Sequence, residues 1–280
     1  MNHDSQEADF VCGLSKLEQD ALRDHAPLPP KLIFKIIRLE GEEELARSFR
    51  ALAFSALAAG IFVSFSFLFR SIFHMYFGSY PTGAVISSLG YTVGFLIVIL
   101  GRMQLFTENP ITTMIPLLSD WSLARLFKVI RLWSTVFVFN IIGTAIAAFF
   151  FASQYTLSPE IEAAMHTVAS NVMRLQPLEN FLRGIPAGIL IAAIVWMSPQ
   201  TKYFRFVMIM FFVYCIALGD FTHVVVGSCE MAYEVLKGDA NFFDYCFEFL
   251  IPTGLGNVAG GTGIFTVLIY NQVKKEILGN

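Results

Sequence analysis

The chain has 280 residues, of which 55% are hydrophobic and only 15% are charged, and its mean hydropathy is +0.61. Soluble domains carry roughly 25% charged residues, so this composition excludes an ordinary soluble protein and indicates a membrane protein. The formal net charge of −3 is small, which argues against nucleic acid as a partner.

The first 45 residues are mostly polar and are predicted to form a cytoplasmic tail and a lead-in helix. Three prolines fall between Pro27 and Pro30, so we expect a tail up to this point, because a helix cannot continue through them. Residues 40–50 are charged and favour a helix that leads into the first span. The predicted domains are 1–45 (tail and lead-in helix), 46–274 (transmembrane channel) and 275–280 (cytoplasmic C-terminus).

Six apolar stretches are long enough to be read as membrane passages, since a span needs about 20 apolar residues. They are residues 51–73, 83–104, 130–153, 181–198, 204–219 and 249–271. Two shorter apolar pieces, 105–118 and 223–236, follow polar interruptions and are predicted to be the second halves of broken helices. The expected fold is therefore an all-α membrane protein with six transmembrane helices, of which the second and fifth are broken.

Lys and Arg concentrate in the N-terminal segment and in the segments that lie on the same side of the predicted spans. Cytoplasmic loops carry an excess of these residues. We therefore expect a multi-pass protein of the inner (plasma) membrane, surrounded by the lipid bilayer, with both termini in the cytoplasm.

The two interruptions carry the polar residues that are most costly in lipid. The first contains Thr107 and Glu108, and the second contains Asp220 and His223. Ionisable groups at membrane depth face protein or water, and paired broken helices in two halves indicate a transport site near the bilayer midplane. Beside them, Leu105, Phe106 and Phe221 are candidates for apolar constrictions or for ordinary core packing.

Asn140 and Asn257 each begin an Asn-x-x-Gly sequence within an apolar helix. Each amide is expected either to hold the non-helical backbone of a break or to join two helices. The spacing from Thr107 to Asn140 nearly equals that from His223 to Asn257. Three spans followed by three spans have opposite orientations, which predicts an inverted repeat.

His223 has two interpretations. A neutral imidazole can donate a hydrogen bond to a solute and exchange a proton near physiological pH. Alternatively, it is a buried structural histidine bonded to a backbone carbonyl. We favour the functional interpretation, because an ionisable side chain at a broken transmembrane helix is expensive.

Several sequences together resemble the formate/nitrite transporter family and lie closest to its YfdC-like inner-membrane branch. They are Leu105-Phe106-Thr107, Asn140-x-x-Gly143, Val195-Trp196-Met197-Ser198, His223, and the run from Ile251 to Gly261. The resemblance implies an aquaporin-like fold and a homopentamer with a separate pore through each protomer. It also implies that Thr107 and His223 face the pore centre between two apolar constrictions.

The chain departs from this family at two positions. Members that transport anions carry a lysine before the fourth span, whereas here no lysine occurs between Lys128 and Lys202, and Arg174 is the nearest basic candidate. The asparagine within the fourth span is also missing. Glu108 and Asp220 add negative charge, which weakens the case for a simple monovalent anion.

The function predicted from the sequence is a channel or proton-linked transporter, not an enzyme. Its solute is a small weak-acid anion such as formate or nitrite, with His223 relaying the proton; a small neutral solute is the alternative. A metal-dependent intramembrane enzyme needs clustered ligands, which a single interior histidine does not supply, and no cofactor is expected. A receptor is the third class, but it leaves the paired breaks unexplained.

Overall fold

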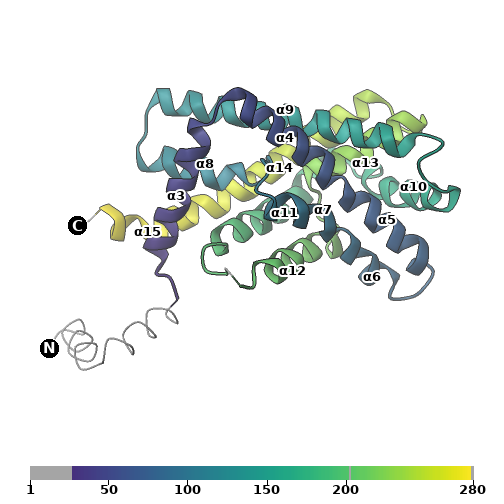
Figure 1. Cartoon of the computed structure of the whole chain (residues 1–280), viewed down its shortest axis with the longest axis horizontal. Helices are drawn as coiled ribbons and strands as arrows, with labels where there is room; N and C mark the ends of the chain where they lie inside the picture. Colours follow the sequence, from purple (N-terminus) through teal and green to yellow (C-terminus); the bar gives the residue numbers. More distant parts are fainter. Residues whose placement is uncertain (1–26, 202, 279–280) are drawn as a thin grey trace.

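A computed structural model describes residues 27–201 and 203–278, and this part of the chain is built from helices (Figure 1). The predicted tail lies almost entirely outside the described residues. The helix predicted to lead into the membrane begins earlier than expected, since α3 runs from Pro30 to Ala46. Its first residue is a proline, which the first turn tolerates because no intrahelical donor is needed there.

The first half of the membrane-embedded chain contains six helices. They are α4 (Phe49–Val63), α5 (Phe65–Phe77), α6 (Gly83–Gly90), α7 (Thr92–Leu100), α8 (Asn109–Ser119) and α9 (Leu123–Ala152). Serine side chains cap two of these helices, because Ser48 accepts from the Ala51 amide and Ser122 accepts from the Arg125 amide.

Helix α10 (Pro159–Met173) connects the two halves. The second half contains α11 (Pro177–Met197), α12 (Arg205–Leu218), α13 (Val224–Lys237), η1 (Asp244–Leu250), α14 (Ile251–Val258), η2 (Ala259–Thr266) and α15 (Val267–Leu278). Helix α10 lies between the predicted third and fourth spans, where no helix was predicted from the sequence.

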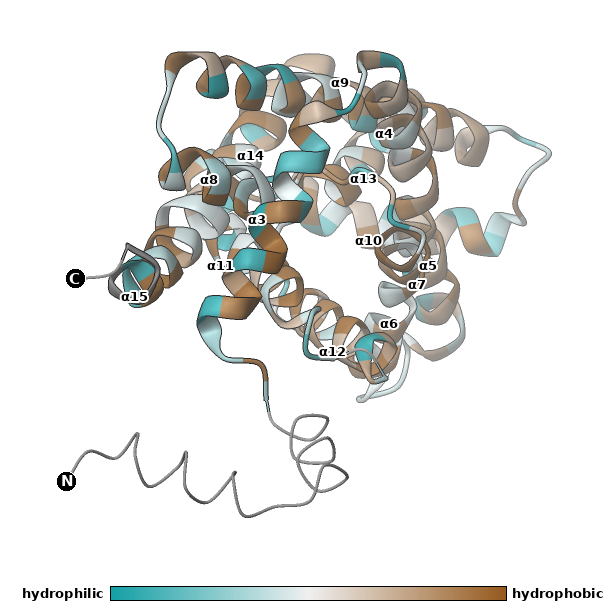
Figure 2. Ribbon diagram, turned by 60° about the vertical axis from the view of Figure 1, so that its left-hand side comes forward, coloured by the Kyte–Doolittle hydropathy of each residue, from teal (hydrophilic) through white to brown (hydrophobic). Residues whose placement is uncertain are grey.

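Four helical segments of the described chain are long and apolar enough to cross a membrane. They are Phe49–Phe77, Gly83–Leu100, Leu123–Ala152 and Pro177–Met197. Figure 2 shows hydrophobic residues along most of the helices, with hydrophilic residues gathered on α3 and on connecting loops. Large side chains such as Phe149 and Phe211 are exposed on the outside of the bundle. Exposed apolar surface of this kind is stable in contact with lipid hydrocarbon but unfavourable in contact with water.

The fifth and sixth predicted spans are not continuous α-helices of membrane-spanning length. Helix α12 has 14 residues, or about 21 Å, which is shorter than the roughly 30 Å bilayer core. The segment predicted as the sixth span is helical over Asp244–Leu278, but two π-helical stretches interrupt its α-helical pattern. Such bulges are frequent at functional sites.

Helices α3 and α15 lie side by side at one end of the molecule (Figure 1). Phe34 of α3 contacts Tyr270 of α15 with their ring centroids 6.1 Å apart, and both rings pack with Ile111 and Ile115 of α8 in one apolar cluster. The lead-in helix is therefore part of the folded bundle.

Candidate permeation site at two broken helices

The two helix breaks predicted from the sequence are present as non-helical segments. They are residues 101–108 after α7 and residues 219–223 after α12. Both helices end in a Schellman motif, in which two amides bond backwards to carbonyls of the last turn. The bonds are Arg102 N to Ile99 O and Met103 N to Val98 O in the first half, and Asp220 N to Ala217 O and Phe221 N to Ile216 O in the second.

The second residue after each helix, which follows a glycine cap, has a left-handed conformation. Arg102 has φ 52° and Asp220 has φ 47°. Glycine usually takes this position, because a Cβ atom costs about 1–2 kcal/mol there. Each side chain forms an ion pair, Arg102 with Glu40 at 3.4 Å and Asp220 with Arg70 at 2.9 Å.

Asn140 of α9 holds the first break. Its Oδ1 accepts from the Phe106 amide at 2.9 Å, and its Nδ2 donates to the carbonyls of Gln104 at 3.0 Å and Ala56 at 2.7 Å. The side chain is fully buried. One amide group thus satisfies the backbone on both sides of Leu105 and ties it to α4.

Asn257 of α14 holds the second break in the same way. Its Oδ1 accepts from the Val224 amide at 2.9 Å, and its Nδ2 donates to the carbonyls of Thr222 at 2.9 Å and Gly184 at 2.8 Å. The backbone groups lie on both sides of His223. Leu105, and not Thr107, is therefore the residue whose position corresponds to His223.

Glycines allow the two asparagine-bearing helices to approach their partners. A Cβ on Gly60 of α4 would lie 2.2 Å from the Asn140 carbonyl oxygen, and one on Gly188 of α11 would lie 2.1 Å from the Asn257 carbonyl oxygen. Any larger side chain at either position would separate these helices. The two halves therefore share their helix contacts as well as their backbone bonds.

Thr107 and His223 meet between the two breaks. Thr107 Oγ1 lies 2.7 Å from His223 Nε2, and both side chains are almost completely buried. The Phe95 ring of α7 packs edge-on against the imidazole, with centroids 4.8 Å apart. Residues more than 100 positions apart thus form one polar pair inside an apolar wall.

The second ring nitrogen fixes the proton on the imidazole. The Val226 amide donates to His223 Nδ1 at 3.3 Å, so His223 caps α13 with its own side chain. A backbone amide only donates, which makes Nδ1 the acceptor and places the ring proton on Nε2. The neutral ring then donates to Thr107 Oγ1, and the threonine hydroxyl keeps its own proton for another acceptor.

Two cavities lie near opposite ends of α11. The first, with a volume of about 340 Å³, is called the α3 cavity and is lined by Glu44, Arg102, Glu108 and Arg205 among others. The second, about 250 Å³, is called the α10 cavity and includes His223 in its wall. The first touches the C-terminal end of α11 at Ser198, and the second touches its N-terminal region at Arg183. Glu108, which follows Thr107, lines the first cavity and His223 lines the second, so the pair lies between them.

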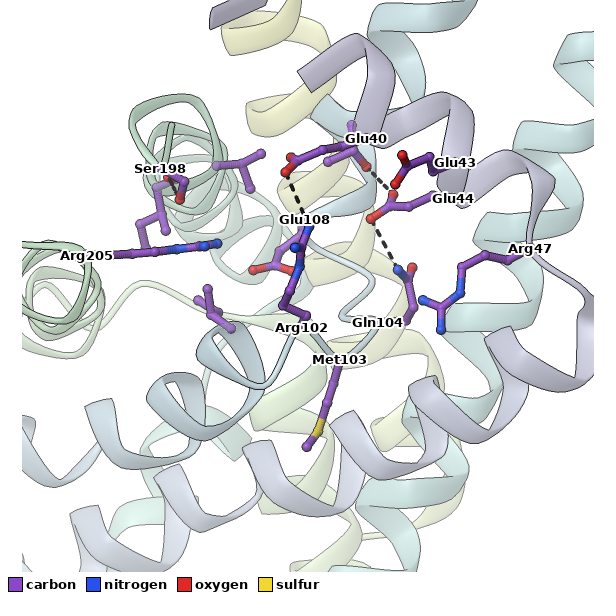
Figure 3. Close-up of a pocket in the computed structure, with 14 residues that line it drawn as sticks. Glu40, Glu43, Glu44, Arg47, Arg102, Met103, Gln104, Glu108, Ser198 and Arg205 are labelled. Carbon is purple, nitrogen blue, oxygen red and sulfur yellow. Dashed lines mark hydrogen bonds and ion pairs between the residues drawn. The ribbon is translucent and has the colours of Figure 1, made fainter. Parts of the chain in front are cut away.

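Glutamates and arginines face each other across the α3 cavity (Figure 3). Glu44 accepts from Gln104 Nε2 at 3.2 Å and from Thr112 Oγ1 at 2.8 Å. Burial raises the pKa of the Glu44 carboxyl, against the opposing effect of these two bonds. Arg205, at the start of α12, extends into the cavity that Glu108 also lines.

The α10 cavity is lined by Arg70, Arg183, Asp220 and Glu230 besides His223. Glu230 of α13 is almost fully buried. Glu230 was not among the site residues predicted from the sequence, although a carboxyl group inside a predicted half-helix was a signal for it. Arg174, the basic candidate from the sequence, does not line this cavity, whereas Arg70 and Arg183 do.

The candidate constriction residues lie in different surroundings. Leu105 is fully buried beside the Thr107–His223 pair, and Phe221 lines the α10 cavity. Phe106 packs against Trp133 and Phe137 of α9, with centroids 6.0 and 4.8 Å away, and lines neither cavity. Its position matches the core-packing interpretation.

The bundle, its two broken helices and the buried polar pair between two cavities define the class of α-helical membrane transport proteins. The sequence profile described as formate/nitrite transporter matches residues 31–271, and the chain belongs to this family. This confirms the resemblance found in the sequence, and the family is one of transporters and not of enzymes.

The chain is 38% identical over 262 residues to the inner membrane protein YfdC of Escherichia coli (strain K12), covering 94% of this chain and 84% of that protein. A pentameric formate channel with formate bound has a similar fold, with a TM-score of 0.69 and 19% identity over 81% of this chain and 97% of that one. A channel of the same family superposes with a TM-score of 0.73 and 15% identity, covering 86% and 98%.

Proposed function

We propose that the protein is a channel or transporter that passes a small weak-acid solute across the inner membrane. The observation that carries this proposal is the buried Thr107–His223 pair, which lies between two cavities near opposite ends of α11. A solute that crosses from one cavity to the other meets the threonine hydroxyl and the imidazole on its way.

The proposed architecture has six membrane passages in two inverted halves, as in an aquaporin-like fold, with both termini in the cytoplasm. The matched bonds of Asn140 and Asn257 support the repeat. The positions of α3 and α15 at one end of the molecule support termini on one side. The similar structure described as pentameric supports a homopentamer with a pore in each protomer. Residues 46–274 are the proposed channel domain.

The lining of the cavities bears on the solute. Arg205 in one cavity and Arg70 and Arg183 in the other offer positive charge to an entering anion, and no lysine is among the described residues that line either cavity. Glu108 and Glu230 lie among them and oppose a permanently charged anion. We therefore favour a weak acid such as formate or nitrite, which loses its charge when protonated. A small neutral solute is the second candidate, because these carboxyl groups do not oppose it.

His223 acts in this proposal as a neutral hydrogen-bond donor to Thr107, whose hydroxyl then donates to the solute. Full proton transfer from a neutral ring would leave an imidazolate, which a buried site does not stabilise. Proton linkage through His223 therefore requires a second proton on Nδ1, and that proton displaces the bond from the Val226 amide. Each cycle of His223 protonation and deprotonation would therefore break and re-form the cap at the start of α13.

The test is stopped-flow uptake into proteoliposomes that contain the purified full-length protein. The panel is formate, nitrite, hydrosulfide, acetate, lactate, water and ammonia, each with and without an inward proton gradient. We expect uptake of a small weak acid above that of protein-free liposomes, accelerated by the gradient. Uptake of water or ammonia alone would assign the neutral-solute function, and no uptake of any compound would contradict transport.

A further inference from the structure

A histidine and two carboxylates meet at the end of α13 opposite to His223. His166 of α10, Glu234 in the last turn of α13 and Asp239 just after it place one potential metal-binding atom each within 4.8 Å of one another. His166 Nδ1 lies 2.9 Å from Glu234 Oε2 and 3.6 Å from Asp239 Oδ2. The transport proposal uses none of these residues.

The backbone holds this arrangement in place. Helix α13 ends at Gly238, whose φ of 88° turns the chain back on itself. The Asp239 amide then bonds to the Glu234 carbonyl at 3.0 Å. A glycine is needed here because a Cβ is strained at this φ. The turn therefore places Asp239 beside Glu234.

The hydrogen bonds of the cluster leave one buried group unsatisfied. Glu234 has no exposed side-chain surface, and its Oε1 has no hydrogen-bond partner although Oε2 faces His166. Buried carboxylate oxygens are normally hydrogen-bonded, and leaving one unbonded destabilises the folded protein. The nearby Lys237 does not neutralise it, because Lys237 Nζ pairs with Glu162 at 2.9 Å. Two carboxylates therefore share one imidazole.

We propose that His166, Glu234 and Asp239 bind a divalent transition-metal ion, with Zn²⁺ as the best match. Zinc takes nitrogen and oxygen ligands at about 2.0–2.2 Å, so a tetrahedral site separates neighbouring ligand atoms by about 3.4 Å. The observed separations of 2.9 and 3.6 Å bracket this value. The ion takes the lone pairs of Glu234 that the protein leaves unused, and water completes its coordination.

The bound ion joins α10, the connection between the two halves, to α13, whose first turn is capped by His223. His166 and Asp239 are about half exposed, so an ion reaches the site from solution without passing through the bundle. The inference is independent of which solute is transported.

The test is Zn²⁺ binding to the purified full-length protein in detergent, prepared without a histidine tag. Equilibrium dialysis with metal analysis and the thermal unfolding temperature are measured in parallel. We expect one saturable Zn²⁺ per chain at this site and a higher unfolding temperature with the metal. His166→Ala and Asp239→Asn should each weaken binding by more than about 10-fold, since even outer-shell changes cost roughly 10- to 100-fold.

Two control variants separate the site from general surface binding. Glu160→Gln removes an exposed carboxylate of α10 that is not part of the cluster, and His74→Ala removes a histidine outside the cluster. Both should keep the wild-type affinity. Equal Zn²⁺ affinity and equal stabilisation in wild type and His166→Ala, or no saturable binding to the wild type, would overturn the proposal and leave a histidine–carboxylate ion pair only.

Discussion

The properties of single side chains decide how polar groups persist inside this bundle. His223 bonds at both ring nitrogens, to the Val226 amide and to the Thr107 hydroxyl. The first bond makes it structural, as a helix cap, and the second is the bond that the proposed transport role uses. The two interpretations of His223 considered from the sequence are therefore compatible. The expected carbonyl partner is replaced by an amide donor.

Replacing Thr107 separates the hydroxyl from the shape of the side chain. Thr107→Val keeps the branched shape but leaves the His223 Nε2–H unpaired in a buried site, which costs about 1–3 kcal/mol. Thr107→Ser keeps the hydroxyl. We expect a lower thermal unfolding temperature for the valine variant than for the serine variant. An equal temperature for both would show that the pair contributes nothing to stability.

At the scale of elements, the sequence located both helix breaks but not their limits. Polar residues in apolar runs are a strong signal because lipid cannot satisfy them, and Asn140 and Asn257 were correctly expected to contact either backbone or helices. The correspondence between the halves was misplaced by two residues, because spacing does not reveal which carbonyl an amide reaches. Helix α10 was missed because its length and polarity did not distinguish it from a loop.

Asn257 should matter far more to stability than an exposed asparagine. Asn257→Leu strips partners from the Val224 amide and from two carbonyls, so the expected cost exceeds roughly 3 kcal/mol. Asn271→Leu, on the exposed face of α15, is the matched control with an effect within about 0.5 kcal/mol. Chemical denaturation in detergent compares them, and similar losses for both would refute the clamp at the second break.

The docking of α3 should depend on pH through Glu44. Its pKa is raised by burial above the ordinary value of 4.5. The folded protein therefore binds a proton on Glu44 more tightly than the unfolded chain does. The contribution of this protonated carboxyl to stability is fully present below the pKa of the unfolded chain, and it is lost as pH rises through the raised pKa of the folded protein. Glu44→Gln mimics the protonated form, so it should raise the unfolding temperature at neutral pH more than at pH about 4.5.

The exposed neighbour Glu43 provides the comparison for this pH series. Glu43→Gln removes one charge from the same helix without touching Gln104 or Thr112, and we expect it to change the unfolding temperature at neutral pH less than Glu44→Gln does. An effect of Glu44→Gln that does not change with pH would argue against coupling between the Glu44 proton and the folded state.

At the scale of the whole molecule, the two halves build their helix breaks from the same three structural features. Each half ends a helix in a left-handed residue, holds the break with an asparagine and lets that asparagine's helix approach through a glycine. The side chains placed at matching positions nevertheless differ, since Leu105 corresponds to His223. The fold class follows from apolar run lengths, and the family follows from motifs. The charges that line the two cavities could not be predicted in this way, because they come from helices that are distant in sequence.

The central claim is that the Thr107–His223 pair lies on the path of the solute. The most direct measurement is the uptake rate of the identified solute in proteoliposomes containing His223→Phe or His223→Asn, after native mass spectrometry has shown the same assembly as in wild type. The account predicts that the phenylalanine variant loses most of its uptake, while the asparagine variant retains polarity but loses any proton dependence. A correctly assembled His223→Phe variant with wild-type uptake would contradict the account.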